Sequence, residues 1–255
     1  MFKFFNNWHE RRIIKRSNIT ALEWDKAFTV LPLLDHLRSD EKKRLQELVI
    51  LFLNEKIFEG AHDLRITQAM RLIIALQACL PILKFGIGDY SGWTSVIVYP
   101  SGYTTKNLMT DEYGIEHQVQ SNLAGEAWLR GPVILAWDAT EHAGIIDGSN
   151  LVIHEFAHKL DMQNGIANGY PPLHSNMLPA AWVKAFGSSF EDFKHRCSHN
   201  KNIGIDCYGA SSPAEFFAVL SEVFFECPDI IIQHYPDIYE QLSLYYRQDT
   251  LSRLK

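Results

Sequence analysis

The chain has 255 residues, of which 47% are hydrophobic and 21% charged, as in ordinary globular proteins rather than disordered chains. With 24 Lys and Arg against 30 Asp and Glu, the formal net charge is −6. Nucleic-acid binding requires clustered positive charge, so no direct nucleic-acid partner is expected. No repeat or long linker divides the sequence, which predicts a single domain over residues 1–255 with about residues 1–30 as an N-terminal extension.

The N-terminal region carries a basic cluster of Arg11, Arg12, Lys15 and Arg16 but lacks the continuous apolar stretch of a signal peptide. The cluster is interpreted as a solvated charged stretch, with contact to anionic lipid as the alternative. No run approaches about 18 apolar residues, so neither a membrane span nor a membrane partner is expected.

The cysteines are scattered and form no C-x-x-C pair, which indicates unpaired thiols and a cytoplasmic location. They are Cys79, Cys197, Cys207 and Cys227.

The first half of the chain predicts two helices. Apolar residues recur near a helical period over residues 40–58, where Asp40 can cap the helix. Residues 66–80 form a second, strongly apolar segment, which Pro81 helps to end.

The middle of the chain predicts a small mixed or antiparallel sheet. Residues 94–99 and 131–137 are rich in β-formers and are predicted strands. The polar residues 104–120 between them form either a loop or a hairpin. An edge strand of such a sheet can hold an extended peptide by strand addition, and both predicted strands are candidates for that edge.

The second half predicts helices. Ser149 or Asn150 can cap the first of them, and Ser212, Pro213 and Glu215 have the spacing of a capping box that opens the third. The four segments are about 150–162, 179–195, 212–225 and 236–247.

His154, Glu155 and His158 form an H-E-x-x-H motif inside the first of these helices. Side chains at i and i+4 share a helix face, so both imidazoles can reach one metal ion. Zinc suits imidazole and carboxylate ligands, and Glu155 is placed to take a proton from a metal-activated water. The pattern therefore predicts a hydrolytic zinc site.

A hydrolytic zinc site needs a third protein ligand. Asp161 and Asn164 stand where an extended metzincin motif requires Gly and His, so that class is excluded. Glu215 and Glu222, seven residues apart on one face of an apolar helix, are the candidates. Spacing alone favours neither, since Glu215 can complete a capping box and Glu222 can pair with a cation.

Three segments of the sequence resemble the Mlc titration factor A family of zinc-dependent peptidases. They are Ile153 to Asp161 (IHEFAHKLD), Asp206 to Ala210 (DCYGA) and Ser212 to Glu222 (SPAEFFAVLSE). The resemblance implies an α+β fold with a zincin-like core, mostly helical with a small sheet, and a gluzincin-like site between two helices.

The same resemblance implies roles for single residues. His154, His158 and Glu215 would hold one Zn²⁺ per chain, Glu155 would be the general base, and Tyr208 would stabilise the oxyanion. Asp161 and Glu222 are candidates for orienting the zinc histidines from behind.

Two functions follow as expectations. The first is a zinc metallopeptidase that acts on a peptide or protein, with aminopeptidase action as one form of it. It would regulate glucose phosphotransferase gene expression through a Mlc-type transcriptional repressor. The alternative is a regulatory protein, weakly catalytic or inactive, that binds and sequesters such a repressor.

Overall fold

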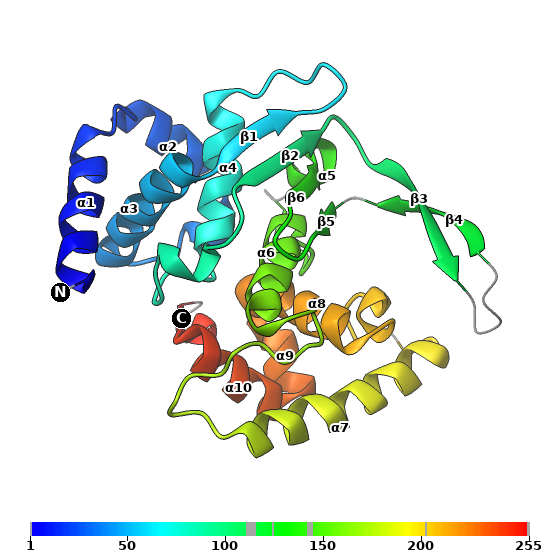
Figure 1. Cartoon of the computed structure of the whole chain (residues 1–255). Helices are drawn as coiled ribbons and strands as arrows, with labels where there is room; N and C mark the ends of the chain where they lie inside the picture. The colour runs from blue at the N-terminus through cyan, green and yellow to red at the C-terminus, as the bar shows by residue number, and fades with distance from the viewer. Residues whose placement is uncertain (1, 111–115, 124, 142–144, 202, 254–255) are drawn as a thin grey trace.

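The computed structural model describes residues 2–110, 116–123, 125–141, 145–201 and 203–253 (Figure 1). The helices are α1 (Phe2–Arg16), α2 (Ala21–Thr29), α3 (Ser39–Glu55), α4 (Gln68–Cys79), α5 (Trp137–Glu141), α6 (Leu151–Asp161), α7 (Pro179–Ser198), α8 (Pro213–Glu226), α9 (Pro228–His234), α10 (Pro236–Tyr246) and α11 (Thr250–Arg253). The strands are β1 (Ile57–Gly60), β2 (Ser95–Tyr99), β3 (Tyr103–Thr110), β4 (Glu116–Leu123), β5 (Gly125–Ala127) and β6 (Val133–Ala136). Short 3₁₀ helices are η1 (Pro32–Leu34), η2 (Ile87–Tyr90), η4 (Met162–Asn164) and η5 (Cys207–Ala210). The predicted α+β class, mostly helical with a small mixed sheet, is confirmed.

The main sheet has four strands in the order β1-β2-β6-β5. β1, β2 and β6 run parallel, and β5 pairs antiparallel with β6. All four residues of β6 are buried, as a central parallel strand requires. The edges are therefore β1 and β5, and the expectation that β2 or β6 forms an edge is wrong because both are paired on two sides.

The polar segment between the two predicted strands contains a hairpin rather than a loop. β3 and β4 pair antiparallel in a sheet of their own, from Tyr103 opposite Leu123 to Thr110 opposite Glu116. The turn of this hairpin, residues 111–115, lies outside the described residues.

The helix predicted over residues 40–58 begins one residue earlier and ends at Glu55. Arg38 occupies the cap position, and the Asp40 carboxylate accepts hydrogen bonds from the Arg38 guanidinium instead of capping the helix. Lys56 follows the last residue of α3 and precedes β1, and its buried ammonium donates hydrogen bonds to the carbonyls of Tyr90 and Trp93.

One continuous core joins the N-terminal helix α2, the sheet and the C-terminal helices. Phe156 of α6 points into an aromatic cluster with Phe52, Tyr90 and Trp93, where most of the rings meet edge to face. This packing buries one face of α6 and fixes the opposite face of the helix toward α8, which α6 contacts (Figure 1).

Cys197 and Cys207 form a disulfide that joins the end of α7 to η5, with 5.7 Å between their Cα atoms. The expectation of four unpaired thiols is thus wrong for these two, whereas Cys79 and Cys227 are free. Spacing along the chain could not reveal the pair because folding brings the two segments together. Disulfides persist mainly in oxidising compartments, so the pairing removes the cysteine argument for a cytoplasmic location.

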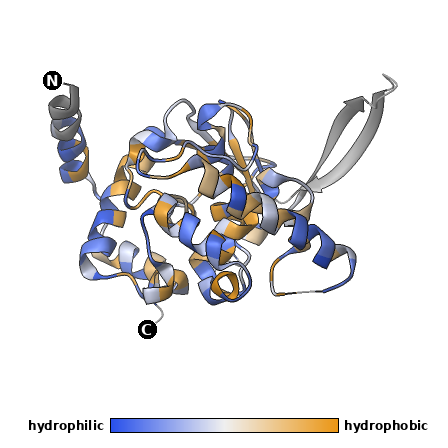
Figure 2. Cartoon of the chain, turned by 90° about the horizontal axis from the view of Figure 1, so that it is seen from below, coloured by the Kyte–Doolittle hydropathy of each residue, from blue (hydrophilic) through white to orange (hydrophobic). Residues whose placement is uncertain are grey.

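No helix among the described residues is long and apolar enough to cross a membrane. The division into one domain with an N-terminal extension stays a prediction. Figure 2 shows hydrophobic and hydrophilic residues interspersed along the helices.

Candidate metal centre

Helix α6 carries the H-E-x-x-H motif on a well-defined start. The Asn150 side chain caps the helix by accepting a hydrogen bond from the backbone N–H of Ile153. His158 follows His154 by four positions, so both imidazoles leave the same face of the helix, with ring centroids 4.8 Å apart. Both side chains are buried, so bulk water has little access to the two imidazoles.

Helix α8 supplies the third side chain. Ser212 caps this helix by accepting from the backbone N–H of Glu215. The Glu215 carboxylate does not return to the cap as a capping box would require, but lies against the two histidines of α6. Glu215 therefore contacts the histidines of the motif instead of completing a capping box.

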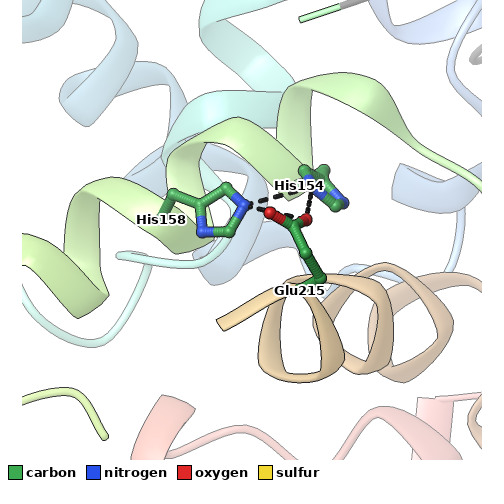
Figure 3. A group of neighbouring side chains, drawn as sticks. All are labelled: His154, His158 and Glu215. Carbon is green, nitrogen blue, oxygen red and sulfur yellow. Dashed lines mark hydrogen bonds and ion pairs between the residues drawn. The ribbon is translucent and has the colours of Figure 1, made fainter. Parts of the chain in front are cut away.

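Three donor atoms converge between α6 and α8 (Figure 3). Glu215 Oε2 lies 3.0 Å from His154 Nε2 and 3.3 Å from His158 Nε2, and the two Nε2 atoms are 3.2 Å apart. Ligands that bind one tetrahedral zinc ion at bonds of about 2.0–2.1 Å lie about 3.3–3.4 Å from one another. The donor set and its spacing are thus compatible with a metal site that keeps a fourth position open.

Glu222 orients His154 from behind. Its Oε1 lies 2.7 Å from His154 Nδ1, and its Oε2 accepts from the backbone N–H of Asn150. A carboxylate on Nδ1 fixes the proton there and leaves the Nε2 lone pair for a metal. Glu222 therefore contacts His154, and among the described residues it forms no ion pair with a Lys or Arg.

Asp161 does not reach either histidine. Its Oδ2 accepts hydrogen bonds of 2.7 Å from the backbone N–H groups of Asn168 and Gly169, so it fixes the loop after α6. His158 Nδ1 is buried and has no hydrogen-bond partner among the described residues. The two expected orienting carboxylates therefore have different roles, and only Glu222 contacts an imidazole.

The charges of the donor set are strongly coupled. Burial lowers the pKa of His154, but hydrogen bonds to Glu215 and Glu222 outweigh it and raise that pKa to about 10. Burial raises the pKa of Glu215, yet the hydrogen bonds to both histidines lower it to about 2. Without a metal ion, a proton on His154 therefore supplies the positive charge of this cluster.

Glu155 points to the sheet side of α6 and is buried. Burial raises the pKa of its carboxyl group to about 7, although the charges of His154 and His158 act in the opposite direction. Its Oε2 has no hydrogen-bond partner among the described residues. A carboxylate with a pKa near 7 is well matched to taking and returning a proton at neutral pH.

Tyr208 lies at the open side of the cluster. Its ring centroid is 6.0 Å from that of His154, and its side chain is half-exposed. Burial of the remaining half, together with the charges of Glu215 and Glu155, raises the pKa of the phenol to about 12. The hydroxyl therefore keeps its proton at neutral pH and can donate a hydrogen bond.

Three residues near the cluster have roles that the sequence did not predict. Glu226 accepts from Asn150 Nδ2 at 2.9 Å and from the backbone N–H of Gly148 at 3.1 Å, so it secures the start of α6. The sequence feature that could have revealed Glu226 is its position four residues after Glu222 on the same helix. Lys159 donates to the carbonyls of Trp128 and Gly131 and thereby holds the β5–β6 turn. Gly125 of β5 lies against Glu155.

Comparison of the sequence with known proteins shows the family of this chain. The chain belongs to the family described as glucose-regulated metallo-peptidase M90, which matches residues 5–247. Mlc titration factor A of Edwardsiella ictaluri (strain 93-146) is 38% identical over 234 residues, covering 91% of this chain and 89% of the relative. Mlc titration factor A of Yersinia pestis (strain Pestoides F) is 35% identical over 236 residues, covering 91% and 87%. The predicted family membership is confirmed.

Proposed function

We propose that the chain is a zinc-dependent metallopeptidase with a zincin-like core, in which His154, His158 and Glu215 hold the ion. The observation that carries this proposal is the convergence of their three donor atoms beside the buried Glu155. Family membership supports the same class of chemistry. The cofactor follows from the donor set, because two imidazoles and one carboxylate with an open fourth position are typical of catalytic zinc.

Glu155 and Tyr208 have separate roles in the proposed peptide hydrolysis. A bound zinc ion would polarise the scissile carbonyl and increase the acidity of the attacking water. Glu155 takes the proton of that water and later returns it to the leaving amine. Tyr208 donates a hydrogen bond to the oxygen on which negative charge develops.

The substrate is a peptide or protein segment in extended form. β5 is an edge strand, pairs only with β6 among the described residues, and lies beside α6. A peptide that adds to this edge passes Glu155, because Gly125 of β5 contacts that side chain. Aminopeptidase action predicts cleavage of peptides with a free N-terminus and none of the same peptides when acetylated.

The zinc proposal is tested by the metal content of the purified protein, measured by mass spectrometry. We expect about one zinc per chain in the wild type and in His195→Ala, whose imidazole is exposed and outside the cluster. His158→Ala and Glu215→Ala should lose most of the ion, because two ligands do not hold zinc tightly. Equal zinc content in all four proteins would contradict the ligand set.

A second function is favoured by the name of the relatives, which refers to titration of Mlc. We propose as the alternative that the chain binds and sequesters a Mlc-type transcriptional repressor of glucose phosphotransferase genes, with little or no catalysis. A cytoplasmic location belongs to this alternative, because such a repressor acts on chromosomal DNA. Retention of repressor capture by a Glu155→Gln variant would support it.

A further inference from the structure

A basic cavity of about 560 Å³ lies between α1, α3 and α4, and none of the residues of the metal centre lines it. Its charged lining is Arg12 and Arg16 of α1 and Arg71 of α4, together with His9. Asn54 and Gln68 add side-chain amides. In Figure 2, the described part of α1 is largely hydrophilic and stands at the margin of the molecule. The site is separate from the proposed peptidase chemistry.

The three guanidinium groups have no neutralising carboxylate. Among the described residues, none of Arg12, Arg16 and Arg71 forms an ion pair, although the chain as a whole has a net charge of −6. Glu10 and Glu55, which follow the lining residues His9 and Asn54 in the sequence, do not themselves line the cavity. Concentrated positive charge of this kind, in an acidic protein, indicates an anionic ligand.

Arg71 is held in advance at the wall of the cavity. Its Nη2 donates to the carbonyl of Leu53 at 3.3 Å, and its guanidinium lies 5.5 Å from the centre of the Phe58 ring. Its Nε is buried and has no partner among the described residues. Such a pre-ordered guanidinium loses little freedom when it binds a phosphate or carboxylate.

The start of α4 acts in the same direction. Gln68 is the first residue of this 12-residue helix and lines the cavity. The backbone N–H groups at a helix N-terminus carry partial positive charge and favour anions. Two arginines of α1, the fixed Arg71 and this helix terminus thus bring positive charge to one cavity from two sides.

We propose that this cavity binds a phosphate group, as carried by a small phosphorylated metabolite. Guanidinium groups match the geometry of phosphate oxygens, and several of them together favour a dianion over a single carboxylate. The volume is within the range of small-molecule sites and exceeds what one phosphate needs, so it leaves room for the organic part of the ligand. A lipid headgroup offers the same chemistry from a second source.

The test uses the whole protein and inorganic pyrophosphate as the probe, with the dissociation constant measured by calorimetry at low salt. We expect saturable binding that Arg12→Gln with Arg16→Gln weakens about tenfold or more, since both lost groups make charge-assisted hydrogen bonds. Both side chains are exposed in the structure, so the fold should survive. The matched control is Arg11→Gln with Lys15→Gln, which removes the same charge from the same helix outside the cavity and should change the constant less than about twofold.

Vesicles of phosphatidylcholine with and without phosphatidylglycerol distinguish the two sources of phosphate. Binding to the anionic vesicles that pyrophosphate displaces, and that only the Arg12 and Arg16 variant loses, would make the headgroup the ligand of the same site. Equal losses of pyrophosphate binding in both double variants would overturn the proposal, because the attraction would then be diffuse. Absence of pyrophosphate binding in the wild type would overturn it as well. None of these readouts depends on peptidase activity.

Discussion

Glu155 has its position because residue 125 has no side chain. A Cβ atom at Gly125 would lie 2.4 Å from Glu155 Oε1 and 2.7 Å from Leu151 Cδ1. Both atoms are at the ends of side chains, so an alanine at position 125 would displace the Glu155 carboxylate. The general base proposed for the reaction therefore depends on a strand that the chemical motif does not include.

We predict that Gly125→Ala lowers the rate of peptide hydrolysis about a hundredfold, because a displacement of about 1 Å at a reacting group costs that much. The three donor atoms of the metal centre are not displaced directly, so zinc content should stay near the wild-type value. Gly187→Ala is the control, since a Cβ there meets nothing within 4 Å. Hydrolysis at the wild-type rate in Gly125→Ala would show that Glu155 is not held by this contact.

Helix α8 presents three carboxylates to α6 and binds it at three points. Glu215 contacts both histidines, Glu222 contacts His154 and Asn150, and Glu226 holds Asn150 and Gly148. Burial raises the pKa of Glu226 to about 7, and the charges of Asp147 and Glu222 act in the same direction. The link between the two helices is therefore sensitive to pH at a point away from the donor atoms.

The sign of this effect follows from proton linkage. The folded state binds a proton at Glu226 more tightly than the unfolded chain, so its contribution to stability falls as pH rises from the ordinary value of 4.5 to about 7. Glu226→Gln cannot ionise. We expect the loss of unfolding free energy between about pH 5 and pH 8 to be about 2 kcal/mol smaller in this variant than in the wild type.

Urea unfolding followed by tryptophan fluorescence at both pH values gives this difference. Glu240→Gln, at an exposed position of α10, serves as the control and should keep the wild-type slope. An unchanged slope in Glu226→Gln would mean that this carboxyl group titrates normally in the folded protein.

The helices of the site were predictable because their signals are local. Asn150, Ser212 and the apolar period around them define α6 and α8 without help from the rest of the fold. The choice between Glu215 and Glu222 was not local. It depends on how α8 crosses α6, and spacing along one helix contains no information about that crossing.

The sheet was harder to predict for the same reason. β1 has only four residues and follows α3 directly, so Phe58 continued the apolar helical period. The edge strands depend on pairing between β1, β2, β6 and β5, whose order differs from their order in the chain. The pairing of Cys197 with Cys207 likewise depends on where α7 ends relative to η5.

At the scale of the whole molecule, the carboxylates and the arginines that surround the two proposed sites lie on different helices. Carboxylates gather on α8 around the proposed zinc position, whereas arginines without carboxylate partners gather on α1 and α4 around the proposed phosphate position. The acidic net charge predicted the absence of a nucleic-acid partner, but it concealed the local basic cavity. Distribution of charge, rather than its sum, carries the functional information here.

Peptide hydrolysis and zinc content in Glu155→Gln test the proposed general base most directly, with Glu240→Gln as the matched surface control. Glutamine keeps the size of the side chain but cannot accept the proton of the attacking water. We predict about one zinc per chain in both variants, and a rate at least about a thousandfold below wild type in Glu155→Gln alone. Hydrolysis by Glu155→Gln at the wild-type rate, with zinc bound, would show that Glu155 is not the general base of a zinc peptidase.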